Sequence, residues 1–273
     1  MKKTSLALAL LGAFAGAASA QTVTLYGRAS VTAVAESGGD SSLLGDDTIY
    51  RLRDGGEATG KGGSRWGLRV KEDLGGGLSA NAILESGFNI DDGSSRQALN
   101  GVGRLFGRQA WVSLESKSLG EVRLGRHLTA TRGVLNEIDP SNNGELKLYS
   151  SRAISAAPGF TSPGTGALVL FTDFGGRVDN SVTYLTPKFG GFQIIGQVGA
   201  GEAVAARYQS LSLAYGAGAL KVGLSYEAYD RDDTYNDTIT FGGNYKFSFA
   251  TLHAGIQRTS DAGSATAING PSQ

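Results

Sequence analysis

The sequence predicts an all-β fold whose antiparallel strands form a barrel that crosses a membrane. Three observations predict this class. Apolar and polar residues alternate with a period of two along most of the chain. The connections between the alternating segments are short and long in turn. After the first twenty residues no apolar run is long enough for a membrane helix, and helical periodicity is weak.

The composition excludes several classes of function. The 273 residues include no Cys and only 2 His, which excludes disulfide scaffolds, thiol catalysis and iron–sulfur clusters and disfavours a histidine metal site. The formal net charge is zero, so we expect no nucleic-acid partner. A hydrophobic content of 40% is too high for a disordered chain.

The first twenty residues have the pattern of a secretory signal peptide. Lys2 and Lys3 precede an apolar stretch over 6–18, which runs into the small-residue sequence Ala-Ser-Ala. The alternative, a membrane anchor helix, needs ~20 apolar residues, and this stretch is shorter. We therefore predict a signal peptide over 1–20 and an exported mature chain that begins at Gln21.

The strands are predicted from the alternation alone. In the first segment Val23, Leu25 and Val31 share one parity, whereas Thr24 and Arg28 share the other. About eleven segments repeat this pattern: 22–35, 64–73, 78–87, 105–116, 120–127, 177–186, 191–199, 206–215, 219–229, 235–247 and 250–259.

The connections between these segments are sorted by length. Short turns are expected near 73–78, 116–120, 187–191, 216–219 and 248. Longer polar loops are expected near 36–63, 87–104, 127–176, 200–205 and 230–234. Tight turns at one end and long loops at the other are typical of outer-membrane barrels, whereas a soluble sandwich has no reason to sort its loops by end.

The alternation does not by itself say which face is wet. In a soluble fold the apolar face points to the core, whereas in a wide membrane barrel it points to lipid. Five aromatic residues share the apolar parity beside the short-turn end: Tyr184, Phe192, Tyr215, Tyr245 and Phe247. This placement predicts an interfacial girdle, and ordinary core aromatics are the alternative.

Seven motifs, in this order and spacing, resemble the general diffusion porins of Gram-negative, especially β-proteobacterial, outer membranes. They are VTLYG at 23–27, SRWGL at 64–68, EDLGGGL at 72–78, LESGF at 84–88, GRLFGRQA at 103–110, LGR at 124–126 and RVDNSVTY at 177–184. The resemblance covers residues 21 to about 259, which is nearly the whole mature chain.

The resemblance implies an outer-membrane homotrimer of 16-stranded barrels, surrounded by lipid, with a water-filled pore in each subunit. Small hydrophilic solutes and ions would diffuse passively through it. The third long loop of such proteins folds into the pore, and the stretch 127–176 stands in that place. Members of the family end on a strand with a terminal aromatic residue, whereas this chain ends on Pro271-Ser272-Gln273. We therefore expect the barrel domain, 21–273, to be incomplete at its C-terminus.

A basic set is the sharpest candidate for a functional site. Arg28, Arg65 and Arg177 lie on the polar parity of the first, second and sixth predicted strands. Arg108 groups with Ala110 on the apolar parity of its segment, so its direction is ambiguous. The resemblance implies that all four arginines line the pore wall opposite the inward loop. The alternative is that they are ordinary solvated residues of a wet barrel face.

The inward loop of the family supplies carboxylates across from this wall. Glu137 and Asp139 are the candidates by their place in the long loop, ahead of Glu145. Cations on one side of a narrow aqueous gap and carboxylates on the other bias which ions pass, and the width of the gap limits solute size.

No catalytic motif accompanies these residues. The serine-hydrolase, zinc-protease, P-loop and dinucleotide signatures are absent after the signal peptide, so we expect no enzyme, no cofactor and no metal. His127 and His253 are expected to be lumen or rim residues. A lipid hydrolase built into a barrel and a soluble β-sandwich adhesin are the alternatives from other classes.

Overall fold

The computed structural model describes residues 22–37, 48–54, 63–97, 103–140, 149–150, 171–172, 176–200, 207–231 and 234–260. The predicted signal peptide lies outside these residues. The main sheet has 11 strands, each hydrogen-bonded to the next. In order they are β1 (Thr22–Arg28), β4 (Arg65–Gly75), β5 (Leu78–Gly87), β6 (Gln109–Ser116), β7 (Gly120–Leu128), β10 (Arg177–Leu185), β11 (Phe192–Gly199), β12 (Arg207–Ala217), β13 (Leu220–Arg231), β14 (Thr234–Lys246) and β15 (Thr251–Ser260).

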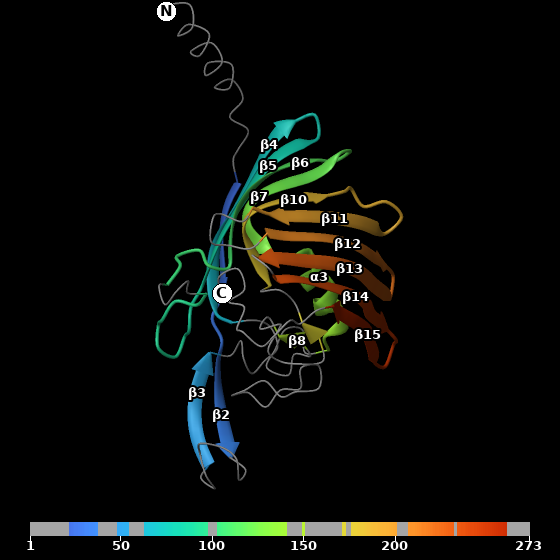
Figure 1. Ribbon diagram of the computed structural model, residues 1–273. Helices are drawn as coiled ribbons and strands as arrows, with labels where there is room; N and C mark the ends of the chain where they lie inside the picture. The colour runs from blue at the N-terminus through green and yellow to red at the C-terminus, as the bar shows by residue number, and fades with distance from the viewer. Residues whose placement is uncertain are drawn as a thin grey trace, which may run out of the picture.

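The all-β antiparallel prediction is confirmed, and the eleven sheet strands match the eleven predicted segments. The sheet is strongly curved, and the helix α3 (Ala130–Ile138) lies on its concave side (Figure 1). Within the described residues, no helix has the length and apolar character needed to cross a membrane.

The tight turns join consecutive antiparallel strands at one end of the sheet, as predicted. The turn between β4 and β5 uses Gly75, Gly76 and Gly77, which have φ values of 81°, 60° and 81°. Only glycine adopts such angles without steric cost, so the run of three glycines allows the chain to reverse here.

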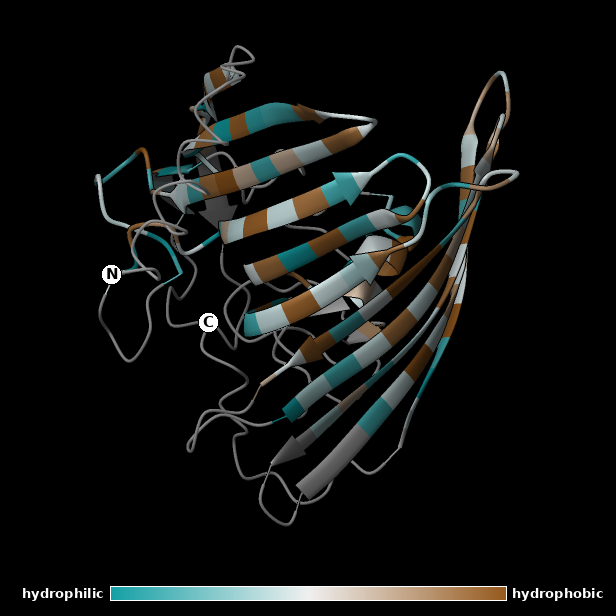
Figure 2. Cartoon of the chain, turned by 90° about the horizontal axis from the view of Figure 1, so that it is seen from above, coloured by the Kyte–Doolittle hydropathy of each residue, from teal (hydrophilic) through white to brown (hydrophobic). Residues whose placement is uncertain are grey.

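The two faces of the sheet have opposite polarity, and the polar face is the concave one. On the outer face Leu25 is 71% exposed and Ile256 is 69% exposed. On the inner face Thr183, Ser225 and Thr240 are almost completely buried. The bands of hydropathy alternate along every strand (Figure 2). A polar interior with an apolar exterior is the inverse of a soluble protein, which decides between the two alternatives that the periodicity left open.

Aromatic residues gather on the outer face beside the tight turns. Phe192 and Tyr215 lie with ring centroids 4.5 Å apart, and Tyr245 and Phe247 lie 4.6 Å apart. Tyr184 is also exposed there. Rings of this amphipathic kind favour the boundary between lipid tails and water, so their position agrees with an interfacial girdle.

The first predicted strand, 22–35, is in fact two strands. After β1 the Ser30 N–H donates to the Ser64 hydroxyl at 3.0 Å instead of continuing the sheet ladder. The chain then enters β2 (Val31–Ser37), which pairs with β3 (Thr48–Asp54) as a separate hairpin. The long connection predicted over 36–63 therefore contains β3.

The long loop predicted at 127–176 contains α3, which the weak helical periodicity did not indicate. Thr129 caps the helix, since its hydroxyl accepts from Arg132 N at 3.3 Å. The buried side chains of Val134, Leu135 and Ile138 lie on one side of the helix. The same loop contributes the short parallel pair β8 (Tyr149–Ser150) and β9 (Phe171–Thr172).

Candidate pore constriction

Two of the predicted arginines stand side by side at the long-loop end of the sheet. Arg28 is the last residue of β1 and Arg65 is the first residue of β4, and they are register partners. Partners in an antiparallel pair project from the same face, so both side chains leave the sheet on its polar side.

Arg108 joins this group through a carboxylate. Its Nε lies 2.7 Å from Oε1 of Glu85, and Arg65 Nε lies 3.6 Å from Oε2 of the same residue. The Tyr26 hydroxyl also donates to Glu85 Oε2, at 3.0 Å. The ambiguous direction of Arg108 is thereby resolved toward the polar face. Strand parity did not decide it because β6 begins one residue later, at Gln109.

Arg177 completes the cluster at the start of β10. Its Nε donates to the carbonyl oxygen of Arg108 at 2.7 Å, and it forms no ion pair with any described residue. Two of the predicted arginines therefore contact one buried carboxylate, Arg177 contacts the backbone of Arg108, and Arg28 adjoins Arg65.

The sequence analysis missed Glu85, although it lies in the LESGF motif and on the polar parity of its strand. Its carboxylate is buried and contacts Arg65, Arg108 and Tyr26. Strand parity indicated its face, but only the register of β4, β5 and β6 brings the partners together.

The two predicted loop acids lie elsewhere. Glu137, on α3, has its Oε1 3.3 Å from Lys221 Nζ and its Oε2 2.8 Å from Asn244 Nδ2. It therefore faces β13 and β14, away from the strands that carry the arginines. Asp139 is 1% exposed. Its backbone N–H donates to the Leu135 carbonyl oxygen at 3.0 Å, at the C-terminal end of the helix. Glu145 lies outside the described residues.

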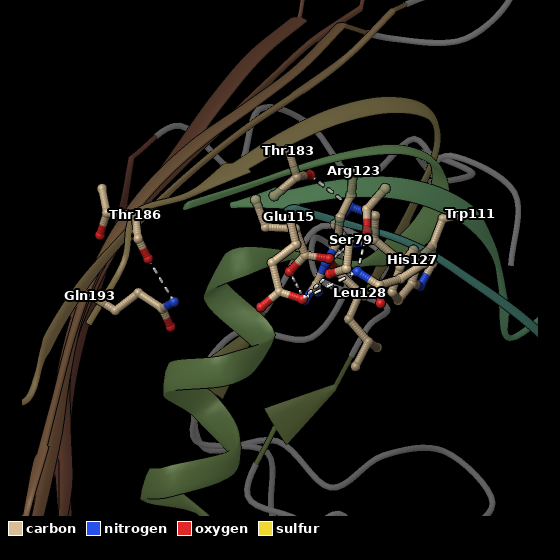
Figure 3. A network of polar contacts seen from close by, with 12 residues as sticks. Ser79, Trp111, Glu115, Arg123, His127, Leu128, Thr183, Thr186 and Gln193 are labelled. Carbon is tan, nitrogen blue, oxygen red and sulfur yellow. Dashed lines mark hydrogen bonds and ion pairs between the residues drawn. The ribbon is translucent and has the colours of Figure 1, made fainter. Parts of the chain in front are cut away.

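Nearer the tight turns, the polar face carries paired charges (Figure 3). Glu115 accepts hydrogen bonds from Ser79 and Asn81 and lies 3.8 Å from Lys71 Nζ. Arg123 sits over the Trp111 ring, with 4.7 Å from its guanidinium carbon to the ring centroid. Arg123 also pairs with Glu121 at 2.7 Å, so Lys71 and Arg123 each have an acid partner.

His127 lies in the same wall as a buried structural residue. Its Nε2 is 2.6 Å from the Thr183 hydroxyl oxygen, and its Nδ1 is 2.9 Å from the Leu128 carbonyl oxygen. Both ring nitrogens are therefore occupied by the wall itself. Arg104 and Arg126 form a second shared site, with their guanidinium nitrogens 2.9 Å and 2.6 Å from the carboxylate of Asp179.

A curved antiparallel sheet with an apolar convex face, an aromatic rim and a charged concave face defines the class of membrane β-barrels with an aqueous interior. The chain belongs to the Gram-negative porin family, which it matches over residues 7–271. This confirms the resemblance seen in the motifs.

Individual relatives agree with this assignment. An outer membrane porin protein of Bordetella pertussis is 36% identical over 291 residues, covering 96% of this chain and 70% of the relative. The outer membrane porin protein 32 of Delftia acidovorans is 36% identical over 277 residues, covering 95% and 70%. The solved anion-selective porin from Comamonas acidovorans superimposes with a TM-score of 0.63 at 31% identity, covering 88% of this chain and 68% of that chain.

The protein is accordingly an outer-membrane channel. It resides in the cell outer membrane and forms a water-filled path for the passive diffusion of small hydrophilic solutes and ions. The polar concave face is the face suited to such a path, because water and ions need polar contacts that lipid cannot supply.

Proposed function

We propose that this pore prefers small anions and that Arg28, Arg65, Arg108 and Arg177 form the basic wall of its constriction. The observation that carries the proposal is the cluster in which Arg65 and Arg108 share one carboxylate, Glu85, and Arg177 donates to the Arg108 carbonyl oxygen. Elsewhere Lys71, Arg123 and Lys221 each pair with one acid, and Arg104 and Arg126 share Asp179.

An uncompensated positive charge on a pore wall attracts anions and raises the barrier for cations. Arginine suits this role because its guanidinium stays charged at any physiological pH. The anion selectivity of the Comamonas acidovorans porin, which the chain resembles at 31% identity, supports the same sign for this protein.

The opposite side of the constriction is assigned to the loop that contains α3, with Glu137 and Asp139 as its acids. The Glu137 side chain is 37% exposed, so it can act on passing ions as well as on the wall. Asp139 is buried, so its carboxylate can act on passing ions only through its electrostatic field.

The remaining proposals concern the assembly. The resemblance to general diffusion porins supports a homotrimer embedded in outer-membrane lipid. The protein acts as a channel without catalysis or a cofactor. Residues 1–20 serve as the export signal, and 21–273 belong to the barrel domain.

The proposal is tested by reversing the wall charge. The double variant Arg28→Glu/Arg65→Glu is expected to shift the zero-current potential toward cation preference in planar bilayers under a salt gradient, because four units of charge change at the constriction. The matched control is Arg69→Glu/Lys71→Glu, which makes the same charge change further along β4 toward the tight turn. It is expected to shift the potential less.

Equal shifts in the two double variants, or no shift in either, would refute the assignment of the arginine wall. The channel itself would stand in both cases, since it is measured by the conductance of the unaltered protein.

A further inference from the structure

We propose that two adjoining rows of residues across β13, β14 and β15 form a seat that holds α3 and thereby sets the width of the constriction. The inference rests on the proposed function, because it takes the α3 loop as one side of the constriction. It assigns a size-determining role to three glycines and a locking role to Glu137.

The first row is made of glycine. Gly223 pairs with Gly242, and Gly242 pairs with Gly255, so the three form one line across the strands. A Cβ added at Gly223 would lie 2.7 Å from Val134 Cγ2. A Cβ added at Gly255 would lie 2.7 Å from Ile138 Cδ1. The apolar side of α3 therefore rests directly on bare backbone.

The second row lies one inward position nearer the tight turns. Lys221 pairs with Asn244, and Asn244 pairs with His253. All three contact Glu137. Lys221 and Asn244 contact the carboxylate of Glu137. The backbone carbonyl oxygen of Glu137 accepts from the Asn244 side chain at 3.0 Å and lies 3.0 Å from His253 Nδ1. The C-terminal end of α3 is thus locked in register with the glycine row.

The other end of α3 is tied to a different strand. The Ala130 N–H donates to the Gln197 side-chain oxygen, on β11, at 3.2 Å. Anchors at both ends leave the helix little freedom to tilt. The absence of side chains at the glycines allows the helix to lie this close to the sheet.

The far side of α3 faces open space. A Cβ added at Gly133 would meet nothing within 4 Å. In an α-helix, position 133 is turned by about 100° from 134 and about 140° from 138, so it lies off the side that packs on the glycines, and Gly133 is exposed. A helix that moves off the sheet therefore carries its Gly133 side toward the interior of the pore.

Steric limits make the direction of this movement predictable. Carbon atoms in contact normally lie about 3.5–4.0 Å apart, so a methyl group at Gly223 cannot share the present space with Val134. Valine is stiff at χ1 in a helix, so the helix itself must retreat. At Gly255 an added Cβ would lie 2.9 Å from Ile138 Cγ2 as well as 2.7 Å from Cδ1, and isoleucine is also stiff at χ1, so a methyl group there displaces the helix too. Gly242 is unsuitable for the test because its Cβ would also clash with the β15 backbone.

The test compares Gly223→Ala with unaltered protein. We expect a partial fall in single-channel conductance and a lower size limit for sugars in liposome swelling. Adding Val134→Ala to Gly223→Ala is expected to restore both values. The control is Gly196→Ala on β11, where an added Cβ meets nothing within 4 Å, and it is expected to conduct like the unaltered protein.

Folding is checked by circular dichroism and by migration on unheated gels. A Gly223→Ala protein that folds and keeps the unaltered conductance and size limit would overturn the seat, while the channel would stand. A fall that Val134→Ala does not reverse would overturn it as well. If Gly223→Ala does not fold, Gly255→Ala takes its place, with a fall that Ile138→Ala reverses, and an unchanged pore then overturns the proposal. Loss of conductance in the unaltered protein would instead defeat the proposed function.

Discussion

At the scale of the residue, Glu85 shows how one carboxylate both organises and limits a positive wall. It holds Arg65 and Arg108 in place, and it also cancels part of their charge. These two effects have opposite consequences for an anion channel. A more selective pore could be made by removing the acid, but the arginines would then lose the group that orients them.

Replacing Glu85 by glutamine separates these effects. The positive potential of the wall rises, so the anion preference measured by the zero-current potential is expected to increase. Stability is expected to fall by about 3 kcal/mol, since breaking a buried ion pair leaves its partner uncompensated. Urea unfolding in lipid vesicles measures that loss.

The matched control is Glu115→Gln, because Glu115 is 44% exposed and pairs with Lys71 near the tight turns. Glu115→Gln is expected to lower the free energy of unfolding by no more than about 1 kcal/mol, as for other exposed ion pairs. A Glu85→Gln protein with unchanged selectivity would show that the arginine cluster lies off the ion path.

The sequence predicted the residues of this cluster better than their contacts. Strand parity placed Arg28, Arg65 and Arg177 on the polar face, and the structure agrees for the register pair. Parity could not orient Arg108, which lies outside β6. It could not reveal that Glu85 joins Arg65 and Arg108, because that contact depends on how neighbouring strands align.

At the scale of the element, α3 is a short helix whose stability comes from its cap and its seat. Nine residues are too few for a stable isolated helix in water. The Thr129 hydroxyl satisfies one N–H of the first turn, and the apolar side is buried against the sheet. The brevity of the helix also explains why periodicity did not predict it, whereas each strand of the main sheet was long enough to show its alternation.

Removing the cap is expected to loosen the helix without changing the pore wall. Thr129→Ala should cost about 1 kcal/mol of helix stability. Amide hydrogen exchange across 130–138 is expected to quicken about fivefold, and open-channel current noise to rise, because the loop fluctuates more. Thr129→Ser keeps the capping oxygen and serves as the control. Equal exchange in the two variants would mean that the seat alone holds α3.

At the scale of the whole molecule, the polarity of the two faces is the reverse of that in a soluble protein, with apolar side chains outside and polar side chains inside. Apolar side chains such as Leu213, Leu224 and Phe241 lie in one register row on the convex face, and each is exposed. In water such a surface would drive aggregation, whereas in lipid it is the favourable exterior. Sorted loop lengths and the placement of aromatics predicted this inversion, which alternation alone could not.

A charge on the convex face tests the inversion directly. Leu224 lies near the middle of β13 and is 44% exposed. In a membrane barrel, Leu224→Arg is expected to destabilise the protein by about 2–4 kcal/mol, because the guanidinium would sit near the bilayer midplane. If water covered the convex face instead, the same exposed substitution would change stability by no more than about 0.5 kcal/mol. Reversible urea unfolding in phospholipid vesicles measures the difference.

The control is Asn81→Arg on the concave face of β5, beside Glu115, where water can solvate the new charge and the loss of unfolding free energy should be small. If Leu224→Arg is tolerated as well as Asn81→Arg, lipid does not cover the convex face.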